Sequence, residues 1–368
     1  MKKVWIGILF AGLALWTLLF CPEPLEAGWA KTYGGGENEF AKSVQQTSDG
    51  GYIVPGYSNT YGAGNFDGWV VKLDADGNIV WQKTYGGLQS DLFYSVHQTS
   101  DGGYIIGGQT STFGAGSTDI WILKLASDGA VEWQKTYGGA QNEYVADVRQ
   151  TSDIGGYVVA GTTCSFGKGN CNAWILKLNQ DGSIAWQKTY GGTGWEFAYS
   201  IRQTSDGGYI MAGETYSFND DSGDAWVVKL DGGGTVEWEK RFGEVGEEDI
   251  ARSVQQTSDG GYIVAGLTES FGASQGDAWV IKLNSDGTVA WEKRYGDNSD
   301  EYAYFVREVE APGSGYIVAG RTNSFGQGGY DAWLLKLATD GTIEWQKTYG
   351  SGASEEVESI SNTSDSGY

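Results

Sequence analysis

The sequence has little of the side-chain chemistry on which many enzymes depend. It contains one histidine, three cysteines and two methionines among 368 residues. It has no G-x-S-x-G elbow, no Cys–His pair and no zinc-ligand spacing. Glycine pairs such as Gly86-Gly87 are not followed by a helical pattern, so they are not phosphate-binding loops. A serine or cysteine hydrolase, a zinc enzyme or a P-loop protein is therefore not expected.

Positive charge and proline are also scarce. Lys and Arg total 24 against 47 Asp and Glu, so the formal net charge is −23 at pH 7. Because this charge repels phosphate backbones, nucleic acid and anionic membranes are poor partners, and cations or basic protein surfaces are better ones. Only four prolines occur, and no low-complexity tract marks a linker.

What the sequence has in abundance is a repeat. The phrase W-x-K-[TR]-[YF]-G occurs seven times, at spacings of 52, 52, 53, 52, 53 and 54 residues. A fixed period of this kind indicates a solenoid, a propeller or another array. The phrase begins at Trp29, Trp81, Trp133, Trp186, Trp238, Trp291 and Trp345.

Each repeat contains four short segments rich in Val, Ile, Tyr, Trp and Thr, with no helical period between them. An Asp-Gly pair separates the third segment from the fourth in every repeat and the first from the second in four of the six, and this dipeptide is a strong hairpin signal. Four antiparallel strands per repeat predict one propeller blade per repeat. In the fifth full repeat the segments are 253–257, 262–266, 278–283 and 289–295.

The motif order SVQQTSDGGYIVAG, DAWVIKL, DG and W is similar to the WD-repeat pattern. It resembles more closely the secreted SBBP-type repeats, a bacterial and archaeal family of seven-bladed β-propellers, over residues 29–368. The resemblance implies an all-β propeller of four-stranded antiparallel blades, seven-bladed with an incomplete last blade. It places the QQTSDGG strand innermost and the WQKTYGG strand outermost. The family has no single assigned activity.

The two ends of the sequence fit this expectation. Residues 29–35 read as an outermost strand, 43–350 as six complete blades, and 360–363 as the innermost strand of a seventh. Tyr368 is the first residue of what would be another YIVAG strand. We therefore expect a chain cut short by about 20–25 residues, which is half of one repeat.

Residues 1–27 are predicted to be an export signal. Lys2 and Lys3 precede the apolar run 4–20, and Ala27 offers a cleavage site. An uncleaved anchor is the alternative, because the run is long for a signal core. The propeller would then occupy 28–368, with no further membrane span, in a secreted, periplasmic or cell-surface protein.

Residues present in every repeat are predicted to be structural. The recurring tryptophans are expected to pack between blades. An acidic residue six positions after each [YF]-G aromatic is predicted to form an ion-pair and hydrogen-bond cluster with the recurring lysines, and a cation-binding ring is the alternative. The single histidine, His97, aligns with Gln45, Arg149, Arg202, Gln255 and Arg307. It is predicted to belong to a variable polar channel lining and not to act as a general base.

Function is better sought where one repeat departs from the others. Cys164 and Cys171 flank one hairpin loop and are predicted to form a disulfide. Trp195 lies outside the recurring tryptophan positions, in the loop before the next blade. The candidate ligand-binding residues on this face are Trp195, Tyr216, Asp220, Asp221 and Lys168, and a weak Ca²⁺ site is predicted at Asp220, Asp221 and Asp224.

The sequence therefore predicts an exported, non-enzymatic recognition or scaffold propeller for a protein or glycan ligand, with Ca²⁺ as its possible cofactor. The alternative is an exported carbohydrate-active lyase or hydrolase, or a quinoprotein-like enzyme, with its site at the channel mouth. The turn L-D-A-D-G-N-I-V-W is similar to the tryptophan-docking repeats of quinoprotein dehydrogenases, one residue short. Two convergent carboxylates, or His97 beside arginines, would favour the enzyme.

Overall fold

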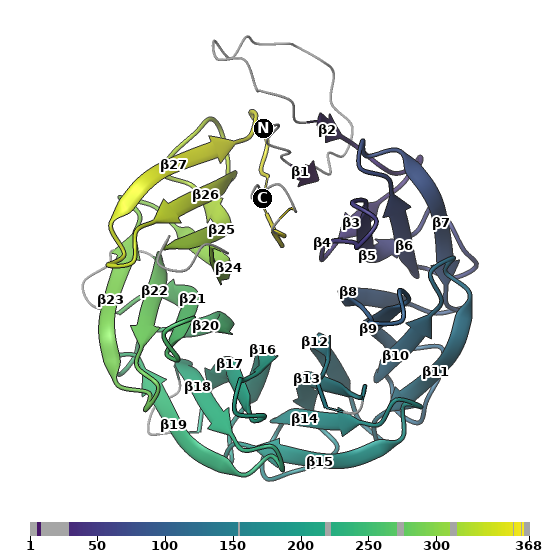
Figure 1. Cartoon of the computed structure of the whole chain (residues 1–368), viewed down its shortest axis with the longest axis horizontal. Helices are drawn as coiled ribbons and strands as arrows, with labels where there is room; N and C mark the ends of the chain where they lie inside the picture. The colour runs from purple at the N-terminus through teal and green to yellow at the C-terminus, as the bar shows by residue number, and fades with distance from the viewer. Residues whose placement is uncertain are drawn as a thin grey trace.

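The structure is a computed structural model of the chain, and it consists of strands arranged as blades around a central axis (Figure 1). It describes residues 6–8, 29–153, 155–217, 222–270, 276–309, 315–355, 357–361 and 363. The described residues include no helix that is long and apolar enough to cross a membrane.

The first three blades follow one another along the chain. Blade one has β3 (Glu39–Ala41) and β4 (Gln45–Gln46) innermost, then β5 (Tyr52–Ser58), β6 (Asp67–Leu73) and β7 (Ile79–Tyr85). Blade two has β8 (Asp91–Gln98), β9 (Tyr104–Thr110), β10 (Asp119–Leu125) and β11 (Val131–Tyr137). Blade three has β12 (Glu143–Gln150), β13 (Tyr157–Thr163), β14 (Asn172–Leu178) and β15 (Ile184–Tyr190).

The next three blades repeat the same antiparallel order of strands. Blade four has β16 (Glu196–Gln203), β17 (Tyr209–Thr215), β18 (Asp224–Leu230) and β19 (Val236–Phe242). Blade five has β20 (Asp249–Gln256), β21 (Tyr262–Thr268), β22 (Asp277–Leu283) and β23 (Val289–Tyr295). Blade six has β24 (Glu301–Glu308), β25 (Tyr316–Thr322), β26 (Asp331–Leu337) and β27 (Ile343–Tyr349).

The prediction of all-β, four-stranded antiparallel blades is confirmed, but the seven-blade count is wrong. The described residues form six blades, of which five have four strands and blade one has its innermost strand split into β3 and β4. Outside them, β1 (Ile6–Ile8) pairs in parallel with β2 (Trp29–Lys31), and the segment 357–361 forms no strand. Because a blade needs four hydrogen-bonded strands, these pieces do not make a seventh.

Both end segments nevertheless pack against blade one. The indole Nε1 of Trp29 donates to the Ala75 carbonyl at 3.0 Å, as Trp81 does to Ser127 at 3.2 Å in the next blade. Near the other end of the chain, the backbone N–H of Gln46 donates to Ser361 Oγ at 3.2 Å. The first blade therefore makes inter-blade contacts with residues from both ends of the sequence.

The turns divide the molecule into two faces. The turn face carries the turn after each innermost strand, which is T-S-D-G-G in blades one, two, four and five, and the x-D-G turn before each outermost strand. Asp101 shows why the first turn has its sequence: it accepts hydrogen bonds from Thr99 Oγ1 at 2.5 Å and from the Gly103 N–H at 2.9 Å, while Gly102 has φ 83°. The loop face carries the longer connections, such as 111–118 and 138–142.

The lysines of the third strands belong to the turn face, which corrects the predicted cluster. Lys124 Nζ lies 3.0 Å from Asp101 Oδ2 and also donates to the Leu125 carbonyl, so this buried ammonium is paired within its own blade. The same pair to the T-S-D-G-G aspartate occurs at Lys72, Lys229 and Lys282.

The recurring acidic residue lies at the other end of the blade, on the loop face. Asp91 is fully buried and accepts hydrogen bonds from Thr110, Thr112 and the Gly87 N–H. Glu301 is bonded in the same way by Thr322 and by the backbone of Asp297 and Ser324. The hydrogen-bond part of the prediction is therefore confirmed, and the ion-pair part is wrong because the lysines lie on the opposite face.

The hydrophobic core lies between neighbouring blades. Trp121 on β10 is 2% exposed, and Trp174 and Trp226 occupy the same place in the next two blades. The outer tryptophans reach across the blade boundary, since Trp81 of β7 packs edge-on against Tyr104 of β9 with centroids 6.2 Å apart. The predicted scaffold role of the recurring tryptophans is thus confirmed.

Candidate binding face of blades three and four

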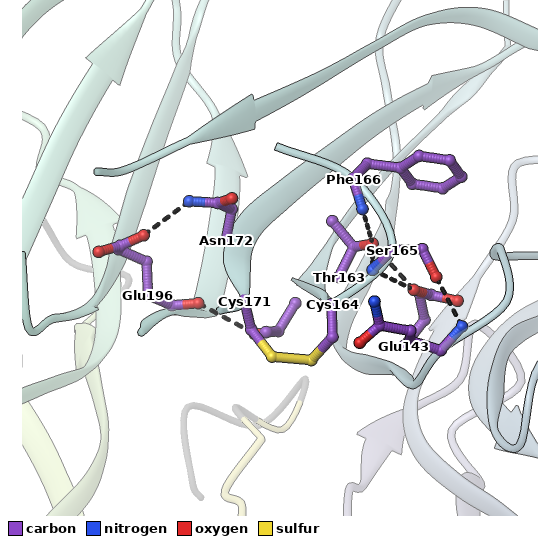
Figure 2. The surroundings of a disulfide bond; sticks show 10 residues. Glu143, Thr163, Cys164, Ser165, Phe166, Cys171, Asn172 and Glu196 are labelled. Atoms are coloured by element: carbon purple, nitrogen blue, oxygen red, sulfur yellow. Dashed lines mark hydrogen bonds between the residues drawn. A yellow bond between two sulfur atoms is a disulfide. The ribbon is translucent and has the colours of Figure 1, made fainter. Parts of the chain in front are cut away.

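The loop face of blades three and four is held together by a disulfide and by backbone hydrogen bonds. Cys164 and Cys171 form the disulfide and close the loop between β13 and β14 (Figure 2). The Cys171 carbonyl then accepts the Glu196 N–H at 3.0 Å, which ties this loop to the start of blade four. The predicted disulfide is therefore present, and it anchors one wall of the face.

Trp195 lies directly beside that wall. Its backbone forms a bridge with Cys171, and its carbonyl accepts the Tyr216 N–H at 2.9 Å. The next residue, Glu196, is fully buried and accepts from Asn172 Nδ2 at 2.7 Å (Figure 2). The backbone on both sides of Trp195 is thus fixed, whereas its side chain is 44% exposed.

The exposed indole is the outer end of a row of aromatic rings along β16. Trp195 stacks on Phe197 with centroids 6.2 Å apart and planes 15° apart. Phe197 stacks on Tyr199 at 5.9 Å and 3°. Because alternate residues of a strand share one face, the three rings form one continuous stack, which we call the aromatic ladder (Trp195, Phe197 and Tyr199).

The inner end of the aromatic ladder is fixed by polar groups. Tyr199 donates its hydroxyl to Glu214 Oε2 at 2.8 Å, and the Arg252 guanidinium lies 4.1 Å from the centre of the Tyr199 ring. Burial raises the pKa of Glu214, and the hydrogen bonds to its carboxyl group reduce this rise without reversing it. The ladder therefore extends from a solvent-exposed indole to a buried carboxyl group and a cation.

The predicted ligand residues are only partly brought together. Lys168 is exposed in the disulfide loop, and Tyr216 is half-buried with its ring edge-on to Phe197 at 6.5 Å. The neighbouring Asn170 N–H donates to the Gly194 carbonyl at 3.3 Å, so the loops of Lys168 and Trp195 touch. Asp220 and Asp221 lie outside the described residues.

The predicted Ca²⁺ site stays a prediction. Asp224 is the first residue of β18, and the equivalent Asp67 closes its own loop by accepting the N–H groups of Ala63 and Gly64. Its position is therefore a recurring scaffold position. Within the described ranges, no group of three His, Cys, Asp or Glu side chains is placed to hold a metal ion.

Sequence reasoning missed Phe197, Tyr199, Glu214 and Arg252. Their signal was present, because the repeats disagree at these strand positions as well as in the loops. The place of Tyr199 is taken by Tyr94, Arg252 and Tyr304 in other blades, and the place of Glu214 by Gln109, Thr162, Leu267 and Arg321.

Comparison with known proteins shows the fold. One structure that shares it is a protein of unknown function from Bacteroides caccae, with 14% identity and a TM-score of 0.50 over 82% of this chain and 96% of that chain. A second is Sqt1 from Chaetomium thermophilum, with 14% identity and a TM-score of 0.50 over 88% of this chain and 75% of that chain. A third is the same Sqt1 bound to the N-terminus of ribosomal protein L10, with 13% identity and a TM-score of 0.50 over 88% of this chain and 78% of that chain. No family model and no curated protein matches the chain, so membership of the SBBP-type family is not supported.

Proposed function

We propose that this chain is an exported recognition module that binds a protein ligand on the loop face of blades three and four. The observation that carries the proposal is the aromatic ladder, because it presents an indole that is 44% exposed and stacked on two half-buried rings. Exposed aromatic residues set in a rigid surface are the usual energetic centres of protein interfaces. A ligand would therefore gain contact area at Trp195 with little loss of conformational entropy.

Charge and topology support the same proposal. The formal net charge of −23 favours a basic surface on the partner, since charge complementarity speeds association. Among the structures of the same fold, Sqt1 is bound to the N-terminus of a ribosomal protein. Export is supported by the signal-like residues 1–27 and by the disulfide of Cys164 and Cys171.

A glycan is the second candidate ligand. The flat face of an exposed indole suits the apolar face of a sugar ring as well as a protein side chain. This candidate differs from the first in its expected dependence on Ca²⁺, which the carboxylates of Asp220, Asp221 and Asp224 would bind.

An enzyme with its site in the channel is a third candidate, because His97 does lie among arginines. Glycoside hydrolysis by the usual route requires two facing carboxylates, and the described lining of the channel contains no Asp or Glu. Turnover of acidic or neutral polysaccharides that is lost in His97→Gln would establish this candidate.

The test compares Trp195→Ala with Leu88→Ala. Leu88 is 81% exposed in the equivalent inter-blade loop of blade two, so its replacement removes exposed apolar surface from the same face without touching the ladder. Each protein is screened against displayed basic peptides and against a glycan array, with and without EDTA. We expect binding that is lost in Trp195→Ala and kept in Leu88→Ala. Binding that is identical in the wild type and Trp195→Ala would overturn the proposal.

A further inference from the structure

The channel contains a cavity at the opposite end of the innermost strands from Trp195. Its volume is about 700 Å³. The innermost strands of all six blades, or the residues at their ends, contribute to its lining, as do residues 359–361 and 363. Thr47, Ser48 and Gly50 of a T-S-D-G-G turn lie on its wall, so it opens at the turn face. This size matches that of typical small-molecule sites.

The lining is positively charged in an acidic protein. Arg149, Arg202 and Arg307 all line the cavity together with His97, and no Asp or Glu belongs to its described lining. The remaining polar lining is made of uncharged Gln, Ser and Thr side chains. We call this set (Arg149, Arg202, Arg307 and His97) the arginine pocket.

A single buried carboxylate behind the wall holds two of the arginines. Asp147 is 5% exposed and accepts hydrogen bonds from Arg149 Nε at 3.1 Å, from Arg202 Nη1 and from Ser95 Oγ at 3.0 Å. It also accepts the Ile201 N–H at 3.2 Å. These bonds connect blades two, three and four, and they fix the two guanidinium groups in place.

Arg149 and Arg202 use few of their donors within the described part of the protein. Among the described residues, Arg149 donates only through Nε to Asp147, and Arg202 donates only through Nη1, to Asp147 and the Ile201 carbonyl. A guanidinium group has five N–H donors, so several remain for a ligand or water. His97 Nδ1 is likewise buried without a hydrogen-bond partner in the described structure.

We propose that the arginine pocket binds the carboxylate or phosphate group of a polar, sugar-sized molecule. Guanidinium groups bind these oxyanions with paired, charge-assisted hydrogen bonds. Arg149 and Arg202 share the single carboxylate of Asp147, which leaves positive charge that an anion would balance. The polar lining suits hydroxyl groups, whereas an apolar ligand would leave the arginines without partners.

The electrostatics of the pocket agree with this geometry. Burial and the charge of Arg202 lower the pKa of Arg149 to about 10, against the opposite effect of Asp147. Burial and the charges of Arg149, Arg202 and Arg307 lower the pKa of His97 to about 3, again opposed by Asp147. An anion in the pocket would relieve both effects, and His97 is well suited to report it because it is the only histidine of the chain.

The test is a titration followed by NMR at the single imidazole. Inorganic phosphate, glucuronate and glucose are added separately at constant ionic strength, with sodium chloride as the reference. We expect phosphate or glucuronate to shift the His97 signal in a saturable way, and glucose and chloride to leave it unchanged. Comparing phosphate with glucuronate distinguishes a phosphate ligand from a sugar acid.

Two variants locate the effect. The test variant is Arg307→Gln, which gives blade six the glutamine that blades one and five carry at this position, Gln45 and Gln255. The control is Arg241→Gln, which removes an exposed arginine from the outermost strand β19. We expect the affinity to fall about tenfold in Arg307→Gln, as for loss of one charge-assisted hydrogen bond, and to be unchanged in Arg241→Gln. Absence of a saturable shift with both anions in the wild type, or equal affinity in Arg307→Gln, would overturn the proposal.

Discussion

The two ends of the innermost strands differ in chemistry although they belong to the same repeated element. At the loop end of β16, the aromatic ladder extends from exposed Trp195 to Tyr199. At the turn end, Arg202 of the same strand lines a cavity with Arg149 and Arg307. One end therefore offers an aromatic surface, and the other offers a cationic pocket.

The difference shows which positions the propeller leaves open to variation. Inter-blade packing requires the buried tryptophans, and the turns require their Asp and Gly residues. Side chains of the innermost strands that point into the channel carry neither duty. Asp147 behind the channel wall varies in the same way, since Ser43, Ser95, Ser200 and Ser253 occupy the same position in other blades.

The largest expected effect is at the turn end, in Asp147→Ser. This change installs the residue of the other blades but leaves Arg149 and Arg202 without their buried carboxylate. We expect the free energy of unfolding to fall by about 3 kcal/mol, measured by urea denaturation. Adding Arg202→Gln should restore part of this loss, and added phosphate should stabilise Asp147→Ser more than the wild type. An unchanged denaturation midpoint would show that Asp147 does not hold the arginines.

The next largest effect is at the loop end, in the double variant Cys164→Ser/Cys171→Ser. The disulfide closes a loop with a sequence separation of 7 residues, so its loss should lower the free energy of unfolding by about 2–3 kcal/mol. Ligand binding at Trp195 should weaken, while the anion-dependent His97 signal should stay as in the wild type. A change at both ends would contradict the independence of the two sites.

The smallest expected effect concerns pH. Burial and the charges of Arg149, Arg202 and Arg307 lower the pKa of His97 to about 3, and the charge of Asp147 opposes this shift. The imidazole of the folded protein therefore stays neutral, whereas that of the unfolded chain is protonated below about pH 6.5. The unfolded state then binds more protons, so stability falls as pH drops from 6.5 towards 3.

At pH 5 this contribution amounts to at most about 2 kcal/mol. We expect the wild type to lose more stability than His97→Gln between pH 7 and pH 5, measured by urea denaturation. The carboxylates titrate in both proteins, so the difference between them isolates His97. Parallel losses in the two proteins would show that the imidazole is not held neutral.

Much of the fold could be predicted from the sequence because the same turn and strand motifs occur in most of the repeats. The Asp-Gly turns predicted the hairpins, and the strands lie within a few residues of the predicted segments, as β21 (Tyr262–Thr268) shows for 262–266. The blade count was wrong because it rested on a family resemblance and on the two ends. Residues 29–31 form only a short parallel pair, and 357–361 form no strand.

The candidate sites were less predictable. Loop departures identified the disulfide and Trp195, since an isolated cysteine pair and a lone tryptophan stand out in a repeat. Tyr199, Glu214 and Arg252 did not stand out, because their contact joins three different strands and two blades. The sequence placed the members of the arginine pocket in a variable channel lining, and it named His97 beside arginines as a sign of an enzyme. That the three arginines meet at one cavity could not be predicted, because they come from three different blades.

The sequence by itself determined the blade, because strand alternation, turn residues and inter-blade tryptophans are local signals that each repeat restates. Only the tertiary structure decided which side chains share an environment. Closing the blades around one axis brings Arg149, Arg202 and Arg307 to one cavity although at least 53 residues separate consecutive members along the chain. Within each blade, the antiparallel strands carry the recurring lysines and the recurring acids to opposite faces.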